Sequence, residues 1–316
     1  MTLGQNLSSV NEFFIVGFQG LHSFRIVFFL VLLLIYIIIL AGNLLVILLV
    51  SSTPCLHTPM YIFLSQLSIS DIIVTSTICP NTLLVTFNDG YTISKAGCIT
   101  QLAAFSASMI TECLLLTVMS YDRYVAICKP MHYLTIVSST LCLQLLLFCW
   151  ALGFLLTIIA TILISSLDFC GSNVIDHFFC DYGPLLRLSC SDTFLLETVV
   201  LFITTNETTF EIVFIFSTYV CIVRSILKMS KSTGKKKAFS TCTSHLTVVC
   251  TCFGSIVAIY VSPSGKKAFG MNKIFSLLYT VLTPLLNPII YSLKNQEIRS
   301  AIVKGFRNQR QILRSE

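Results

Sequence analysis

The chain has 316 residues, of which 55% are hydrophobic and only 11% are charged. A soluble globular protein carries about 25% charged residues, because its surface must face water. This composition excludes an ordinary soluble enzyme and a disordered protein, and it indicates an integral membrane protein. The formal net charge of +6 does not favour nucleic-acid binding, because Lys and Arg residues also collect beside membranes.

Seven stretches of the sequence are long and nearly free of charge. In chain order they are Ile26 to Val50, Pro59 to about Thr86, Ala96 to Tyr121, Leu141 to about Ile164, Thr193 to Val223, Ala238 to Gly265 and Ile274 to Leu293. Each is long enough to cross a hydrocarbon core of about 30 Å as a helix that rises about 1.5 Å per residue. They predict an all-α membrane protein with a seven-transmembrane helix bundle.

We expect a single domain, with an N-terminus over residues 1–24, the bundle over 25–293 and a cytoplasmic tail over 294–316. In the tail, Ile298, Ile302 and Phe306 recur every four residues among basic residues. This spacing predicts a short amphipathic eighth helix on the inner membrane surface. The loop from about Ser165 to Asp192 is rich in aromatic residues and cysteine, which predicts a folded plug.

The distribution of basic residues predicts the orientation of the chain. If the N-terminus lies outside, fourteen of the 20 Lys and Arg residues fall on the cytoplasmic side. The positive-inside rule therefore places the N-terminus outside the cell. The sequon that begins at Asn6 then lies on the outer side, so we expect a glycan on Asn6.

Four of the 14 cysteines lie at or beyond the outer boundary: Cys98, Cys170, Cys180 and Cys190. The outer side is oxidising, so disulfides are expected there. Four cysteines allow three pairings, and their spacing alone does not choose among them.

Two acidic residues lie near the middle of the bilayer. Asp71 in the second span and Glu112 in the third reach a similar depth, and Asn43 and Asn287 approach the same level. Ionisable residues at membrane depth are costly, so each is a functional candidate. A small cation held by oxygen ligands would offset the repulsion between the two carboxylates. The alternative is a protonated, hydrogen-bonded acid pair without a metal.

A charged tripeptide, Asp122-Arg123-Tyr124, lies at the inner end of the third span. Adjacent Asp and Arg side chains can hold each other until another interaction pulls Arg123 away. The alternative is a pair of solvated interfacial charges. The lysines at 235–237 either contact an acidic partner or only mark the topology. Pro288 interrupts the seventh span and predicts a bend there.

Two apolar faces lie in the predicted outer half of the bundle. One comprises Phe105, Ser106, Met109 and Ile110 on the third span, and the other comprises Phe253, Val257 and Tyr260 on the sixth. If these faces meet, they form an apolar cavity with a few hydroxyl groups, as a small-ligand pocket requires. The alternative is ordinary core packing.

The sequence contains none of the catalytic motifs expected of a membrane enzyme. It has no His-Glu-x-x-His, no Gly-x-Ser-x-Gly and no phosphate loop, and its five histidines lack metal-ligand spacing. We therefore expect that the protein is not an enzyme. A proton-coupled transporter is the rival class, because two buried carboxylates suit a proton relay. The odd number of spans and the lack of a repeat argue against the inverted-repeat transporter folds.

Ordered motifs extend over almost the whole chain. They are Gly42-Asn43, Leu56 to Tyr61, Leu67-Ser68 leading to Asp71, Met119 to Cys128, Val174 to Asp181, Lys237 to His245 and Pro284 to Tyr291. Together they resemble the odorant receptors, a family within the rhodopsin-like G-protein-coupled receptors. The chain is most similar to the tetrapod-type (class II) branch, which responds to airborne odorants.

This resemblance implies a receptor that binds a small volatile odorant and activates a stimulatory, olfactory-type heterotrimeric G protein, which raises cAMP. It implies a location in the plasma membrane of olfactory sensory neuron cilia. It implies that Cys98 pairs with Cys180 and Cys170 with Cys190, and that Asp71 and Glu112 flank a sodium ion. The implied odorant-binding residues are Phe105, Ser106, Met109, Ile110, Ile203, Glu207, Phe253, Val257, Tyr260 and Thr280. The implied coupling and activation residues are Asp122, Arg123, Tyr124, Tyr219, His245, Asn287, Pro288 and Tyr291.

The chain departs from the family pattern at a few positions. Ser120 replaces the usual Ala and Met131 the usual Leu, which are mild changes. Glu207 and Glu211 are larger departures, because they are acids one turn apart on the fifth span and Glu207 is expected to face the pocket. An acid there suits an amine or a strong hydrogen-bond donor. The alternative is a protonated glutamate bonded to a neighbouring helix. A receptor of the same fold for a non-volatile metabolite or peptide is the alternative function.

Overall fold

The computed structural model describes residues 10–20, 24–170, 172–229, 232–261, 266–294 and 297–303. Within these residues, seven helical segments are long and apolar enough to cross a membrane, which confirms the predicted bundle. They are α1 (Arg25–Ser52), α2 (Pro59–Asn88), α3 (Lys95–Cys128), α5 (Ser139–Ser165), α7 (Phe194–Lys228), α8 (Ser232–Val261) and a composite seventh segment. The seventh comprises α9 (Lys266–Leu277), a π-helical turn (Leu278–Leu282) and α10 (Thr283–Lys294).

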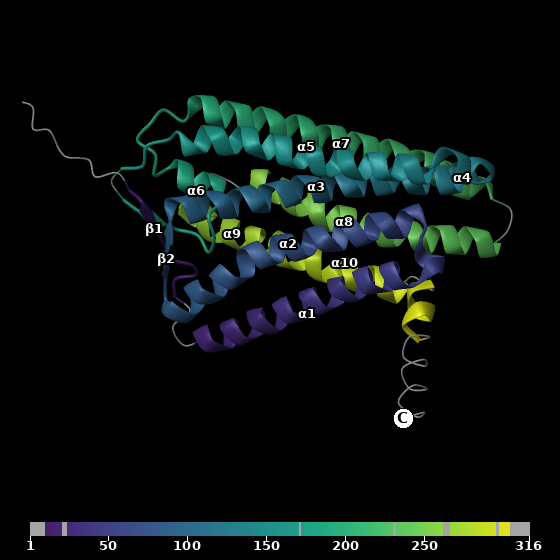
Figure 1. Cartoon of the computed structure of the whole chain (residues 1–316), viewed down its shortest axis with the longest axis horizontal. Coiled ribbons are helices and arrows are strands. Elements are labelled where there is room, and N and C mark those ends of the chain that lie inside the picture. Colours follow the sequence, from purple (N-terminus) through teal and green to yellow (C-terminus); the bar gives the residue numbers. More distant parts are fainter. Residues whose placement is uncertain are drawn as a thin grey trace, which may run out of the picture.

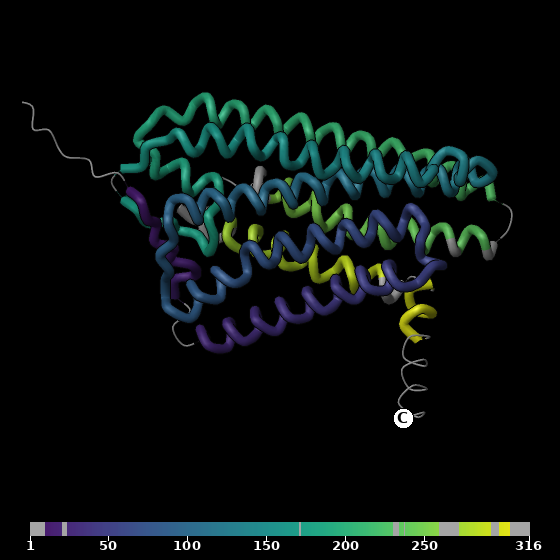
Figure 2. The backbone as a smooth tube through the Cα atoms, viewed as in Figure 1, coloured from purple at the N-terminus to yellow at the C-terminus, as the bar shows by residue number. Residues whose placement is uncertain are grey.

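The long helices run side by side along the long axis of the molecule, with α3 between the α1 side and the α5–α7 side (Figures 1 and 2). In the most apolar stretch of α3, 72% of the residues are buried, whereas in that of α1 only 22% are buried. Helix α3 packs against α2, α5, α7 and α8. It is therefore the central helix, through which contacts at one end of the bundle reach the other.

Large apolar side chains cover the outside of the bundle. Leu30 on α1, Leu147 on α5 and Phe216 on α7 are 55%, 62% and 69% exposed. A soluble protein would bury such side chains, because burying each one stabilises the folded state by about 1.5–3 kcal/mol. Here they face the hydrocarbon of a bilayer, as the composition predicted. The chain is a multi-pass membrane protein.

A small β-sheet caps one end of the bundle. Strand β1 (Glu12–Ile15) pairs antiparallel with β2 (Tyr91–Ser94) and parallel with β3 (Val174–Ile175), in the order β2-β1-β3. Phe13 and Ile15 are fully buried beneath it. We call this the sheet end; the short helix α6 (Tyr182–Leu186) also lies there (Figure 1). The all-α prediction did not include the sheet, because strands of two to four residues show too few alternations to be recognised.

The opposite end carries the last turns of α3 and the short helix α4 (Tyr133–Ile136) (Figure 1). We call it the Arg123 end. Two short 3₁₀ turns, Pro54–Leu56 and Pro130–His132, connect helices there. Residues 297–303 are helical and bury Ile298 and Ala301. Phe306 and the rest of the predicted eighth helix lie outside the described residues, so its place on the membrane surface stays a prediction.

The sixth and seventh segments differ in detail from their predicted limits. Helix α8 begins at Ser232, six residues before the predicted start, and the predicted end at Gly265 lies outside the described residues. The seventh segment is helical through Pro288 and departs from α-geometry earlier, in the π-helical turn. Pro288 has no N–H to give the carbonyl of Pro284. Asn43 donates to that carbonyl instead, at 3.1 Å.

Candidate functional site

A buried polar cluster joins four helices at the middle of the bundle. Asn287 of α10 donates to both carboxylate oxygens of Asp71 on α2, at 3.0 and 2.9 Å. Asn43 of α1 donates to Ile39 and to Pro284, one turn from Asn287. Glu112 of α3 interacts electrostatically with Asp71. The structure thus brings together the four polar residues that the sequence placed at one depth.

The oxygens of this cluster fit a small hard cation. Oδ1 of Asn43, Oδ1 of Asn287 and both carboxylate oxygens of Glu112 are buried, and none forms a hydrogen bond to another described residue. Buried polar atoms are normally paired, so a group of unpaired oxygens around two carboxylates calls for a positive partner. Na⁺ and similar ions take oxygen ligands. No group of three His, Cys, Asp or Glu side chains in the described part suits a transition metal.

At the Arg123 end, Asp122 is held by two partners. Arg123 donates to its Oδ2 through Nη2 at 2.7 Å and through Nε at 3.2 Å. Tyr133 of α4 donates to its Oδ1 at 2.7 Å. Burial and the neighbouring Asp122 carboxylate raise the pKa of Tyr133 above its usual value, so the phenol keeps its donor proton. Asp122 is 1% exposed, so its pair with Arg123 is not the solvated alternative.

A second contact at this end ties α7 to α8 and α3. The hydroxyl of Tyr219 lies 2.8 Å from Nδ1 of His245, and Nε2 of His245 lies 3.2 Å from the carbonyl of Leu116. A carbonyl only accepts, so Nε2 carries the proton and Nδ1 accepts from Tyr219. Tyr291 of α10 is 3% exposed and its hydroxyl has no partner in the described part. Tyr219 and His245 therefore hold α7, α8 and α3 together at the Arg123 end.

Some of the predicted odorant-binding residues divide between two apolar clusters. Phe105 and Met109 pack with Phe178 and Phe179 of the loop between α5 and α7. Phe253 and Ile110 belong to the larger core nearer the Arg123 end.

The other predicted odorant-binding residues whose side chains are described lie outside these two clusters. Thr280 is buried and donates to Ser276, whereas Val257 is 43% exposed. Ser106, Ile203 and Glu207 are partly buried. The side chain of Tyr260 and the whole of Asn6 lie outside the described residues.

The loop between α5 and α7 is folded over the sheet end, as predicted. Disulfides join Cys98 to Cys180 and Cys170 to Cys190, the two pairs that the resemblance implied. Lys273 of α9 donates to the carbonyl of Gly17 at 2.8 Å and forms an ion pair with Asp176. The loop is therefore tied to α3, to the N-terminal segment and to α9.

His177 lies at the centre of this loop. It is 3% exposed and stacks on Phe178, with ring centroids 4.6 Å apart. Neither ring nitrogen has a hydrogen-bond partner in the described part. Burial, with Lys273, lowers the pKa of His177 below its usual value, although the carboxylates of Asp181 and Asp176 oppose this. The imidazole is therefore neutral at physiological pH.

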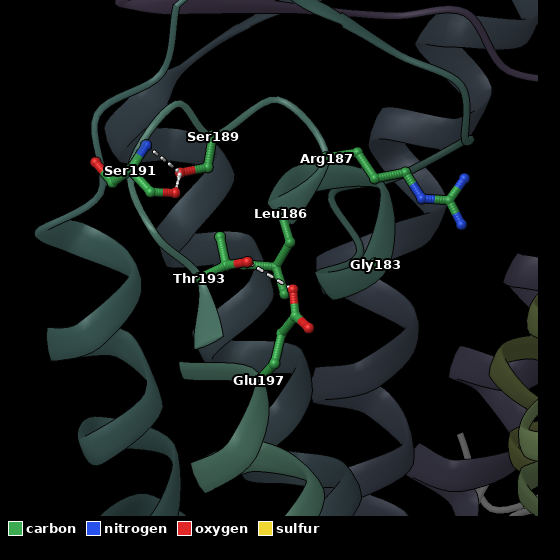
Figure 3. Close-up of a pocket in the computed structure, with 7 residues that line it drawn as sticks. All are labelled: Gly183, Leu186, Arg187, Ser189, Ser191, Thr193 and Glu197. Carbon is green, nitrogen blue, oxygen red and sulfur yellow. Dashed lines mark hydrogen bonds between the residues drawn. The ribbon is translucent and has the colours of Figure 1, made fainter. Parts of the chain in front are cut away.

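The sheet end also carries an open cavity of about 470 Å³. It is lined by Gly183, Leu186, Arg187, Ser189, Ser191, Thr193 and Glu197 (Figure 3). Thr193 donates to Glu197 at 2.6 Å, and the Arg187 side chain extends away from this pair (Figure 3). None of the nine predicted odorant-binding residues whose side chains are described lines it. It is a surface hollow beside α6, distinct from the predicted pocket.

Comparison with known proteins decides the family. A family model described as "Olfactory receptor" matches residues 32–309. Olfactory receptor 5G26 of Mus musculus is 43% identical over 305 residues, which cover 96% of each chain. Olfactory receptor 6B1 of Homo sapiens is 45% identical over 300 residues, which cover 95% of this chain and 96% of the relative. Olfactory receptor 1G1 of Gorilla gorilla gorilla is 44% identical over 303 residues, which cover 95% and 96%.

The chain belongs to the olfactory receptor family. It is a G-protein-coupled receptor rather than an enzyme, and the family implies an odorant ligand and coupling to a G protein. Its relatives match it over nearly their full length, so the bundle and both of its ends belong to the shared part.

Sequence reasoning missed several residues that organise this receptor. Tyr133 has no signal beyond its place after Pro130, although it supplies one of the three hydrogen bonds that orient Asp122. Gln101 of α3 accepts from the backbone of Cys180 and donates to the carbonyl of Thr77. The sequence gives Lys273 no role beyond that of a basic residue on the predicted outer side. Each contact joins segments far apart in the chain, so no local pattern reveals it.

Proposed function

We propose that this receptor binds a small volatile odorant between α3, α7 and α8, on the sheet-end side of the buried polar cluster. Binding there is transmitted to a stimulatory, olfactory-type heterotrimeric G protein at the Arg123 end, and cAMP rises. The basic residues near the Arg123 end favour a cytoplasmic position for it, because Lys and Arg accumulate on that side. The N-terminus and the two disulfides then face the oxidising exterior. The receptor would act in the plasma membrane of sensory neuron cilia.

The observation that carries this proposal is the network at the Arg123 end. Asp122 holds Arg123, while Tyr219 and His245 tie α7 and α8 to the carbonyl of Leu116. These are single hydrogen bonds, each with a net contribution of about 0.5–1.5 kcal/mol, or more for a charged pair. A ligand that binds the open form better than the closed form can therefore shift the equilibrium. Releasing Arg123 and moving α8 outward would expose a basic surface to the G protein.

The buried polar cluster would hold a sodium ion in the resting receptor. Asp71, Glu112, Asn43 and Asn287 supply the oxygens, and the unpaired ones support a cation over a hydrogen-bonded acid pair. The ion would supply the positive charge that two buried carboxylates lack. When it leaves, Asp71 keeps Asn287 as its donor, which links α2 to the inner half of α10.

The proposal is tested by measuring cAMP in cells that express the receptor with either a stimulatory or an inhibitory G-protein α-subunit. The cells are exposed to volatile ketones, alcohols, acids and amines. We expect a response only with the stimulatory subunit, lost in Arg123→Ala and retained in Arg224→Ala, an exposed arginine on α7. Phe105→Ala should change which odorants act. Silence from a receptor that reaches the surface would contradict the volatile ligand and favour a non-volatile metabolite or peptide.

A further inference from the structure

Two carboxylates lie one turn apart on the core-facing side of α7. Glu207 and Glu211 are four residues apart, so their side chains project from the same face of the helix. Glu211 is 1% exposed and Glu207 is partly buried. The opposite face of α7 is lipid-facing, with Phe202 and Phe210 exposed at 68% and 62%. The two acids therefore point into the bundle and not into the bilayer.

Within the described residues, one buried oxygen of each carboxylate has no hydrogen-bond partner. Oε1 of Glu207 and Oε1 of Glu211 are both buried without a hydrogen bond. The ion pairs of Arg123 and of Lys273 do not involve Glu207 or Glu211. This excludes a bond to a neighbouring helix as the reason for an acid at Glu207, at least within the described residues.

The described groups that interact electrostatically with Glu211 from other helices belong to α3, α5 and α8, and none of them is basic. Glu211 interacts electrostatically with Cys113 of α3, Cys149 of α5 and Cys252 of α8. Thiols are weak donors and do not satisfy a carboxylate. No three His, Cys, Asp or Glu side chains here form a metal-ligand group within the described residues. A bound metal ion is therefore a poor explanation for the acids.

The surroundings of the pair are apolar. Phe253, next to Cys252 on α8, is 5% exposed, and Ile110 lies one turn from Cys113 on α3 and packs against the same core. A ligand that reaches both acids must therefore combine a cationic hydrogen-bond donor with a hydrocarbon body. A primary ammonium group meets the first requirement, because its three N–H groups can serve two carboxylates at once.

We propose that Glu207 and Glu211 together bind the ammonium group of an organic amine, whose hydrocarbon part packs against Phe253 and Ile110. This inference rests on the proposed odorant function and names its ligand class. The acids that are costly in the empty receptor become paired when the amine binds. The bound amine also bridges α7 and α8, which the Tyr219–His245 contact holds together nearer the Arg123 end.

The test measures binding directly, so that it does not depend on signalling. The purified receptor in lipid nanodiscs is heated with hexylamine or with hexanol, which has the same chain without the charge. A ligand that binds the folded state raises the unfolding temperature in proportion to its affinity. We expect hexylamine to stabilise the wild type far more than hexanol does. Glu207→Gln and Glu211→Gln should weaken hexylamine about ten- to a hundredfold, as expected for lost hydrogen bonds to a charged group.

Glu197→Gln is the matched control, because Glu197 lies in the first turn of α7 and its carboxylate already accepts from Thr193. It should leave hexylamine affinity unchanged. Without ligand, Glu211→Gln should unfold at the same temperature as the wild type or higher, because it removes an unpaired buried acid. A lower temperature would reveal a structural partner for Glu211 and overturn the proposal.

The proposal is also overturned if hexanol matches hexylamine, or if hexylamine stabilises the wild type and both Gln variants equally. Failure here is distinct from failure of the proposed function. Neutral odorants that raise cAMP while hexylamine does not bind would contradict the amine site alone. Hexylamine binding that needs both glutamates, without any cAMP response, would support the amine site and contradict the signalling proposal.

Discussion

The two ends of the receptor are stabilised in different ways. The sheet end is held by two disulfides, a three-stranded sheet and the contacts of Lys273. The Arg123 end is held by apolar packing and by side-chain hydrogen bonds, among them those of Asp122, Tyr133, Tyr219 and His245, with no strand or disulfide among its described residues. Covalent and sheet contacts resist opening, whereas single hydrogen bonds exchange readily. The difference fits the proposed receptor, which would keep its ligand-binding end fixed and change shape at the other end.

The largest effect is expected from removing the disulfide between Cys98 and Cys180. It anchors the folded loop to the start of α3 and closes a span of 82 residues. Replacing both cysteines with Ser should cost about 2–5 kcal/mol of stability. Most of the protein should then fail to reach the cell surface, as measured by surface labelling. Cys55→Ser, at an exposed free thiol, is the control. Normal display of the double variant would show that noncovalent contacts suffice at the sheet end.

A smaller effect is expected at the contact between α3 and α5 that lies between the two ends. A Cβ on Gly153 would lie 2.8 Å from the carbonyl oxygen of Ala107 and 2.5 Å from Oγ1 of Thr111. Gly153→Ala must therefore push the helices apart, which should lower the stability of the folded receptor by about 1–3 kcal/mol. A lower unfolding temperature in nanodiscs would show it. Gly254→Ala, where nothing lies within 4 Å, should be nearly neutral. Equal unfolding temperatures would mean that this helix contact yields without cost.

Tyr133→Phe tests the Arg123 end by itself. It leaves Oδ1 of the buried Asp122 without its donor, a loss of about 1–3 kcal/mol from the closed state. Basal G-protein activation should rise by about five- to a hundredfold, since about 1.4 kcal/mol is a factor of ten in an equilibrium. Surface display should not change. Tyr121→Phe, one residue before Asp122, is the control and should behave as the wild type. Unchanged basal activity in Tyr133→Phe would show that the contact from α4 does not stabilise the closed state.

The smallest effect is a pH dependence confined to the sheet end. The pKa of His177 is lowered in the folded loop, so below about pH 6.5 the unfolded loop binds more protons than the folded one. Stability is therefore present above that pH and is lost as the pH falls, by at most about 1.4 kcal/mol per pH unit. Unfolding temperatures at pH 7.5 and 5.5 should differ less in His177→Phe than in the wild type. His132→Phe, at an exposed site near α4, should not alter the difference.

The sequence predicted the bundle because membrane spans leave a strong local signal. Twenty or more apolar residues without charge admit few other structures, so the sequence predicts the seven segments and misses only their exact ends and the π-helical turn of the seventh. The β-sheet was missed because each strand is short and its partners lie far away in the chain: Phe14 pairs with both Thr92 and Val174. Local periodicity does not report such pairing.

Side-chain contacts likewise differ in how far a local sequence signal predicts them. Depth along a helix placed Asp71, Glu112, Asn43 and Asn287 at one level, because the rise per residue is fixed. Depth does not give the direction of a donor. The bond from Tyr133 to Asp122 and the bond from Lys273 to Gly17 both depend on loops whose path the sequence does not specify. The unpaired state of Glu207 and Glu211 likewise emerges only once their neighbours are known.

Hydrogen exchange measured by mass spectrometry on the receptor in nanodiscs tests the contrast between the two ends most directly. Wild type is compared with Tyr133→Phe. We predict faster exchange in peptides that cover α4 and the adjoining turns of α3, α7 and α8, and unchanged protection in β1, β2 and β3. Exchange that rises equally in the strands would show that the two ends open together and would contradict the account.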